Sequence, residues 1–201
     1  VGTTEAIARE LDAMRIPYER PLDTGLVATL AGTAPDAYRE DGAPRRRLLI
    51  RADIDALAVT ERTGVPFASE RVGVMHACGH DCHIAMQLGA LRVLAQMTDA
   101  LHGEVRAVFQ PSEENGQGAR MMIDTGVLEG VDGAYAAHIW SEVDAGTISC
   151  EAGPRMANTD WFRVDVRGTS CHGAMPQRGA DAIVAAAEIV NNHRKPRPQP
   201  L

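Results

Sequence analysis

Hydrophobic and polar positions along the chain switch repeatedly between helix-like and strand-like spacing. Apolar residues recur at helical spacing in four segments, which predicts helices over 3–14, 84–97, 119–123 and 181–191. Short apolar or alternating runs predict strands over 25–31, 48–52, 105–109, 133–137, 147–150 and 161–167. Because strands and helices follow one another by turns, the pattern predicts an α/β fold with a mostly parallel sheet flanked by helices.

The last predicted strand differs from the earlier ones, because its polar and apolar residues alternate as if one face were solvated. This change predicts a domain boundary between Pro154 and Asp160. We expect a first domain over 1–157, the beginning of a smaller domain over 158–192 and a tail over 193–201. The tail is basic and rich in proline, so we expect it to be disordered. Both ends of the chain read as edges of a longer protein.

Composition limits the type of protein, the partners and the location that we expect for this chain. With 45% hydrophobic and 23% charged residues the chain is typical of a globular protein. The net charge of -7 argues against nucleic acid as a partner, because phosphates require a basic surface. No apolar run is long enough to span a bilayer, and no secretory signal is visible, so we expect no membrane partner. Two of the four cysteines lie in histidine-rich motifs, which favours metal chemistry over a disulfide framework and a reducing cytoplasm as location.

The densest chemistry lies in the run Met75-His76-Ala77-Cys78-Gly79-His80-Asp81-Cys82-His83. Cys78 and His80 stand where a loop enters a helix, and a thiolate beside an imidazole suits zinc and its neighbours rather than calcium or magnesium. A structural zinc clip or a reactive cysteine beside histidines is the simpler alternative. A structural site usually recruits a second Cys or His pair at knuckle spacing, and no such pair follows.

Further polar residues stand just after predicted strands: Asp53, the pair Glu113 and Glu114, and His138. Each alone has an ordinary explanation, as a strand-ending turn, a solvated loop or a buried core histidine. In open parallel sheets, however, binding sites gather at the carboxyl ends of the strands. The agreement between independent positions therefore predicts one site.

Spacing suggests which of these groups could bind a metal and which could act as a base or orient a ligand. Adjacent side chains diverge, so one of Glu113 and Glu114 can hold a metal while the other acts as general base. The segment Asp53-Ile54-Asp55 can supply a carboxylate that orients a ligand histidine. His83 lies three residues after His80 and shares its helix face. It can be a ligand, an orienting donor or a capped surface residue, and we favour the orienting donor.

Five motifs, in this order, resemble those of one enzyme family: 51–57 (RADIDAL), 76–81 (HACGHD), 109–114 (FQPSEE), 137–140 (AHIW) and 172–176 (HGAMP). They resemble the metal-dependent amidohydrolases of the hippurate hydrolase and auxin–amino-acid conjugate hydrolase type, which belong with the aminoacylase-like metallopeptidases. The resemblance implies a zinc-aminopeptidase-like catalytic domain that holds two metal ions. It also implies a smaller α+β lid that often dimerises, and a parent homodimer or homotetramer.

The resemblance also implies residue roles. Cys78 would bridge two divalent metal ions (Zn, Mn, Co or Ni), and His80, Glu114 and His138 would be further ligands. Glu113 would be the general base, and His172 would contact the carboxylate or the developing oxyanion of an N-acyl amino acid substrate. The family supplies one more ligand histidine from a part of the catalytic domain that we do not find here.

Two alternatives stay open. The chain can be a metal-binding fragment that keeps four ligands without catalysis. It can instead be related to a di-zinc aminopeptidase, which needs a recognition site for a free substrate amine. We find no obvious site of that kind.

Overall fold

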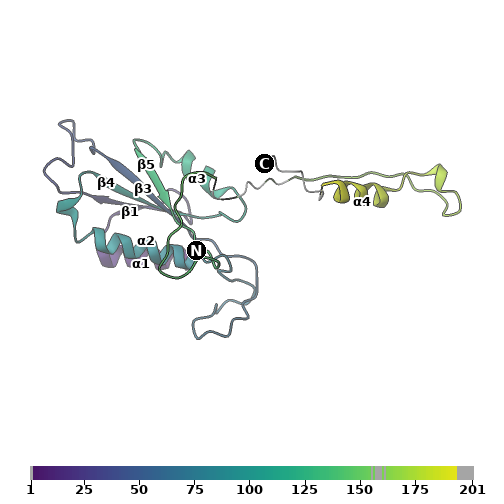
Figure 1. Cartoon of the computed structure of the whole chain (residues 1–201), viewed down its shortest axis with the longest axis horizontal. Coiled ribbons are helices and arrows are strands. Elements are labelled where there is room, and N and C mark those ends of the chain that lie inside the picture. Colours follow the sequence, from purple (N-terminus) through teal and green to yellow (C-terminus); the bar gives the residue numbers. More distant parts are fainter. Residues whose placement is uncertain (1, 155, 157–159, 161, 194–201) are drawn as a thin grey trace. The chain divides into compact units, whose positions relative to one another are not determined.

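The structure is a computed structural model that describes residues 2–154, 156, 160 and 162–193 (Figure 1). The chain divides into two compact units, Val1–Ile148 and Ser149–Leu201. The first unit holds the sheet and the strand-end residues, whereas the second holds His172. The assignment of 1–157 and 158–192 to a catalytic domain and a lid stays a prediction.

The first unit is built on a five-stranded sheet with the order β1-β2-β4-β3-β5. Its strands are β1 (Tyr18–Glu19), β2 (Leu26–Ala31), β3 (Arg47–Asp53), β4 (Glu104–Gln110) and β5 (Gly133–Ala136). β3 pairs in parallel with β4 and β5, while β2 is antiparallel to both β4 and β1. The α/β prediction is confirmed, with a mixed sheet whose parallel part brings three carboxyl ends to one edge.

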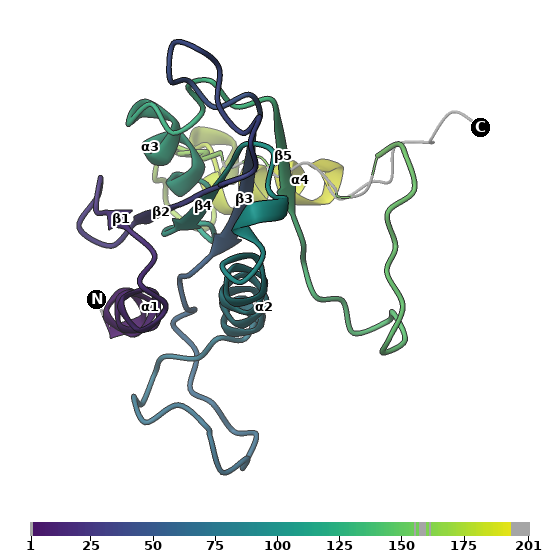
Figure 2. The ribbon, with the colours of Figure 1, turned by 90° about the vertical axis from the view of Figure 1, so that its left-hand side faces the viewer.

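Helices cover both faces of this sheet. α1 (Gly2–Met14) and α2 (His80–Leu94) lie on one face, and α3 (Gly118–Asp124) lies on the other (Figures 1 and 2). The larger core cluster joins Leu11, Leu91 and Phe109, each fully buried, and the smaller one includes Val108 and Met122. Successive residues of β4 therefore enter opposite cores, which explains its unbroken apolar run.

The beginning of α2 differs from the prediction in a way that matters for the site. The helix starts at His80 rather than at residue 84 and ends at Leu94. Gly79 precedes it with φ +81, a left-handed conformation that glycine adopts without strain. His80 and His83 consequently both lie in the first turn of α2. Among the described helices, none has the length and hydropathy required to cross a membrane.

The second unit contains less regular structure than the pattern predicts. Its described elements are the 3₁₀ turn η2 (Pro176–Arg178), the helix α4 (Ala182–His193) and one bridge between Thr169 and Ala180. A similar 3₁₀ turn in the first unit, η1 (Thr98–Ala100), precedes β4.

Two predicted strands are wrong. Residues 147–150 and 162–167 form no strand, and Trp161 lies outside the described residues. Ile148, for example, is 82% exposed. An apolar run becomes a strand only where another strand pairs with its backbone, and no described segment does so here. The predicted tail lies outside the described residues except for His193, which ends α4.

Candidate metal centre

The site lies at the carboxyl edge of the parallel strands, around His80. Asp53 ends β3, the pair Glu113 and Glu114 follows β4, and His138 stands two residues after β5. The Nε2 atom of His80 lies 3.7 Å from Asp53 Oδ2, 3.8 Å from Glu113 Oε2 and 3.8 Å from Glu114 Oε1. Three carboxylates from two strand ends thus surround one imidazole nitrogen.

A second group of ligand atoms shares the same histidine. The Sγ atom of Cys78 lies 3.5 Å from Nε2 of His138, a residue 60 positions later in the chain. Cys78, His80 and His138 each offer one ligand atom within 4.8 Å of the others, and so do His80, Glu113 and Glu114. The structure therefore brings together five of the six predicted site residues. His172 belongs to the other unit, where its Nδ1 accepts a hydrogen bond from the Ala174 backbone.

The residues present fit a metal ion. Among the described residues, His80 Nε2 and Glu114 Oε1 are buried atoms without a hydrogen-bond partner, an arrangement that costs stability unless something else binds them. Two ligand atoms on one zinc ion, each about 2.1 Å from it, lie at most about 4.2 Å apart. The 3.8 Å between these two atoms is within that limit. The unpaired atoms and their spacing match a divalent cation.

Asp55 orients two of these groups. Its main-chain oxygen lies 3.0 Å from His80 Nδ1, so that nitrogen donates and Nε2 keeps its lone pair for a metal. Its side-chain Oδ2 accepts a hydrogen bond of 3.1 Å from the backbone N–H of Glu114. Asp55 thereby contacts a histidine on α2 and the backbone of the loop after β4. It reaches the histidine through its main-chain oxygen, whereas the sequence predicted a carboxylate for this task.

Asp53 lies behind the site as a buried, ionised carboxylate. Burial acts to raise its pKa, but the hydrogen bond with His83 and the charge of Arg51 outweigh burial and lower the pKa below the usual value. Asp53 lies 2.5 Å from His83 Nδ1 and 2.9 Å from the Arg51 guanidinium. Because His83 occupies Oδ1 of Asp53 and the Arg51 guanidinium pairs with Oδ2, Asp53 is better placed to orient its neighbours than to bind metal.

Arg51 lies beside the site, and the sequence reasoning gave it no role. Besides Asp53, it donates from Nε to the Gln110 side chain at the end of β4 over 2.8 Å. Residues two apart on a strand point to the same face, so the spacing of Arg51 and Asp53 was the available signal. Arg51 joins the ends of β3 and β4 behind the candidate ligands.

The loop after β4 sets the directions of the two glutamates. Ser112 has φ +56, an uncommon conformation for a residue with a side chain, and its carbonyl accepts a 2.9 Å hydrogen bond from Gly118. The Glu113 side chain is 41% exposed and that of Glu114 is 27% exposed. Their distances to His80 are equal, so exposure and the unpaired buried oxygen of Glu114 separate them. Glu114 faces inward and Glu113 lies on the open side.

The Cys78 thiol is protonated at neutral pH when no cation is bound. Burial, and after it the negative charge of Glu114, raises the pKa of this thiol above its ordinary value. A metal binds the thiolate, so binding would release this proton.

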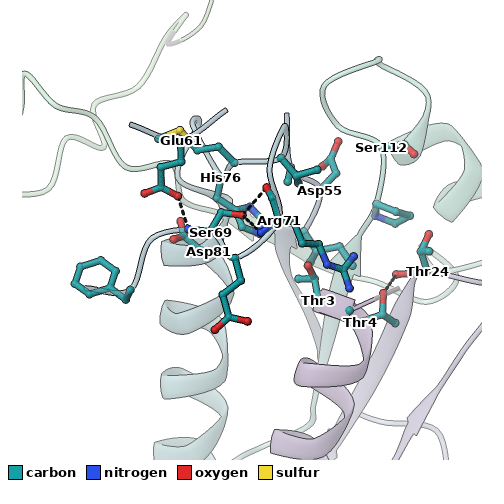
Figure 3. Close-up of a pocket in the computed structure, with 18 residues that line it drawn as sticks. Thr3, Thr4, Thr24, Asp55, Glu61, Ser69, Arg71, His76, Asp81 and Ser112 are labelled. Carbon is teal, nitrogen blue, oxygen red and sulfur yellow. Dashed lines mark hydrogen bonds between the residues drawn. The ribbon is translucent and has the colours of Figure 1, made fainter. Parts of the chain in front are cut away.

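A cavity of about 680 Å³ lies beside Asp55 and His76 (Figure 3). It lies against the first turn of α1 and the segment 61–76, and Asp55, His76 and Ser112 are among the residues that line it. Cys78, His80, Glu113, Glu114 and His138 do not line it. The cavity therefore contacts the orienting residue Asp55 and not the candidate ligands.

A comparison with known families identifies the protein family of this chain. Residues 49–200 match the model of the peptidase family M20/M25/M40. The chain belongs to this family. The predicted resemblance to metal-dependent amidohydrolases is thereby confirmed at the level of the family.

Named members of the M20 group resemble the chain closely. It is 42% identical to an N-acyl-L-amino acid amidohydrolase of Geobacillus stearothermophilus, over 88% of this chain and 46% of that protein. It is 35% identical to an IAA-amino acid hydrolase of Arabidopsis thaliana, over 94% of this chain and 41% of that protein. The chain spans less than half the length of these relatives.

A solved structure gives the same fold. The crystal structure of a dinuclear metal-binding peptidase of the M20 family from Bacillus subtilis matches with a TM-score of 0.70 and 40% identity. The match covers 77% of this chain and 41% of that one.

Proposed function

We propose that the chain supplies the metal centre for hydrolysis of the amide bond of N-acyl amino acids or similar small amides. One observation carries the proposal: Cys78, His80 and His138 form one ligand group, and His80 forms another with Glu113 and Glu114. Two relatives support the proposal by their names: one is an N-acyl-L-amino acid amidohydrolase and the other is an IAA-amino acid hydrolase. A small-molecule substrate follows from this proposal.

We assign Cys78, His80, Glu114 and His138 as the residues that would hold two divalent metal ions. The mixed thiolate, imidazole and carboxylate set suits Zn, Co, Ni or Mn, and it does not select one of them. A bound pair of such ions lowers the pKa of a water molecule and polarises the amide carbonyl.

Glu113 is the proposed general base. Its carboxylate lies on the open side of the centre, 3.8 Å from His80 Nε2, where a water molecule can approach it. Glu113 would take a proton from the attacking water and pass it to the leaving nitrogen, so that the products are a carboxylic acid and an amine. His172 would hold the substrate carboxylate or the oxyanion through its exposed ring.

The wider setting follows from the same proposal. We infer a homodimer or homotetramer for the parent enzyme and no role for nucleic acid, in line with the net charge of -7. The cytoplasm is the proposed location, because Cys78, Cys82, Cys150 and Cys171 are free thiols.

The test is to measure metal content and hydrolysis on the same preparation. The chain is loaded with Zn²⁺, Mn²⁺, Co²⁺ or Ni²⁺ and assayed against a panel of N-acyl amino acids and against unacylated dipeptides. Hydrolysis of the acylated compounds supports the proposal, and hydrolysis of the dipeptides alone supports the aminopeptidase. Bound metal without turnover favours the metal-binding fragment, and absence of bound metal contradicts the centre itself.

A further inference from the structure

His138 is the candidate ligand with the least support from its own strand. β5 ends at Ala136, two residues earlier, and the His138 side chain is exposed. Its Nδ1 lies 2.5 Å from the main-chain oxygen of Ile139, the next residue. The position of the His138 ring beside Cys78 must therefore be set by what holds Ile139.

Ile139 is held twice. Its backbone N–H donates to Nε2 of His83 over 3.0 Å. Its side chain fills the space left by Gly79, since a Cβ atom added at Gly79 would lie 2.3 Å from the Ile139 Cδ1 atom. Gly79 stands between Cys78 and His80, so the Ile139 side chain packs against the backbone that carries two other ligands.

Asp53 holds His83 in the tautomer that can accept the hydrogen bond from the Ile139 N–H. Its ring is buried, and Nδ1 lies 2.5 Å from Oδ1 of Asp53, whose other oxygen pairs with Arg51. With its proton on Nδ1, facing the carboxylate, His83 has only the Nε2 lone pair to offer, and Ile139 uses it. The His83 ring also meets the His138 ring edge to face, with centroids 4.5 Å apart.

We infer that His83 and Gly79 position the exposed ligand His138 through Ile139. This inference rests on the proposed metal centre. His83 is then a positioning residue and no ligand: Arg51 and Asp53 fix its ring, its ring fixes the Ile139 backbone, and Ile139 presents His138 to Cys78. Such a chain of contacts keeps the loop after β5 ordered before any metal arrives, so that binding does not have to order it.

The experiment compares His83→Leu, which removes the acceptor for Ile139, with His83→Gln, whose side-chain oxygen can replace it. Two readouts are used. Amide hydrogen exchange on the metal-free chain reports the Ile139 N–H, and Co²⁺ titration, followed by the absorption of the thiolate–cobalt bond, reports the centre. His102→Leu is the matched control, because His102 is an exposed histidine of the same unit that pairs with Asp36.

We expect His83→Leu to speed exchange at Ile139 by at least about tenfold while amides in β4 stay protected. Its Co²⁺ affinity should fall by about 10 to 100-fold, as is usual when a group that orients a ligand is removed. His83→Gln should recover most of both, and His102→Leu should change neither. Unchanged exchange and unchanged affinity in a folded His83→Leu chain would overturn the inference.

Ile139→Ala decides the matter if His83→Leu does not fold. It leaves the pair of His83 and Asp53 and the left-handed Gly79 in place and removes the side chain that packs against Gly79, so faster exchange at residue 139 and weaker Co²⁺ binding support the inference. Normal exchange and binding in Ile139→Ala refute it. If the unaltered chain binds no Co²⁺, the proposed function fails, while exchange at Ile139 in the metal-free variants still tests the positioning.

Discussion

The Nδ1 atom of His80 donates to the main-chain oxygen of Asp55 over 3.0 Å, and this one contact determines which nitrogen of the imidazole is free. With the proton on Nδ1, the lone pair of Nε2 points to the carboxylates of Glu113 and Glu114. Asp55 follows β3 and His80 begins α2, so the contact ties the edge of the sheet to the helix. The relationship gives Asp55 an influence on the proposed metal centre through His80.

Replacing Asp55 by alanine should weaken metal binding by about 10 to 100-fold. The main-chain contact with His80 survives this change, whereas the hydrogen bond from the Glu114 N–H to Asp55 Oδ2 is lost. Competition with a chromophoric chelator measures the affinity. Asp124→Ala is the control, since Asp124 is exposed and pairs with Arg120 at the surface. Equal affinity in the Asp55 variant and the control would show that the loop after β4 needs no such support.

Replacing the two glutamates should separate chemistry from metal binding. Glu113→Gln keeps a similar shape but cannot accept a proton, so turnover should fall by about 10² to 10⁴-fold with metal content near normal. Glu114→Gln removes a charged ligand and should lower metal content together with turnover. Both are measured by elemental analysis and by hydrolysis in a protein that contains this chain and is active. Loss of metal in Glu113→Gln would reassign Glu113 as a ligand.

Much of the first unit could be predicted because its signals are local. The apolar run at 105–109 and the polar residues after it gave β4 and the placing of Glu113 and Glu114 at its end. The parallel pairing of β3 with β4 and β5 then brings Asp53 and His138 to the same edge. Residue type and strand direction were enough to predict which side chains gather.

The rest depends on contacts that no local pattern carries. Residues 147–150 have a strand-like composition but no partner strand among the described residues. The hydrogen bond between Arg51 and Gln110 and the contact of Ile139 with Gly79 join segments that are distant in sequence. The left-handed conformation of Ser112 is a single backbone angle that the local pattern does not indicate. His80 and His83 have different proposed roles because different groups contact their ring nitrogens. The sequence does not indicate those contacts.

The buried Asp53 should make stability depend on acid in a characteristic way. Its pKa is lowered in the folded chain, although burial alone would raise it, because of the His83 hydrogen bond and the Arg51 charge. Its contribution is therefore complete above the unfolded value of about 3.9 and is lost as the pH falls through the folded pKa.

The measurement is the free energy of unfolding of the chain and of Asp53→Asn by urea, with a chelator present. At pH 7 the variant should be less stable by about 1 to 3 kcal/mol. The difference should stay constant down to about pH 5 and shrink below about pH 4. The pKa of Asp36 is also lowered, by its hydrogen bond with His102. Asp36 is present in both proteins, so its contribution cancels in the difference between their free energies of unfolding. A difference that persists unchanged to pH 3 would contradict the assignment of an ionised Asp53.

Two glycines should respond in opposite directions to the same substitution. A Cβ atom at Gly118 would lie 1.5 Å from the carbonyl oxygen of Pro111, whereas one at Gly89, on the exposed side of α2, would meet nothing within 4 Å. Gly118→Ala should thus force apart the loop that carries Glu113 and Glu114 and cost about 1 to 3 kcal/mol. Gly89→Ala should stabilise the chain by about 0.5 to 1 kcal/mol, because alanine favours the helix.

Urea unfolding of the two variants gives the stability, and chelator competition gives the metal affinity. Gly118→Ala should lose both, since the displaced loop moves the Glu114 carboxylate away from His80, while Gly89→Ala should keep the metal affinity of the unaltered chain. If Gly118→Ala is destabilised but binds metal normally, the closed loop serves folding alone. The geometry of Glu114 would then depend on Asp55 rather than on the packing of Gly118 against Pro111.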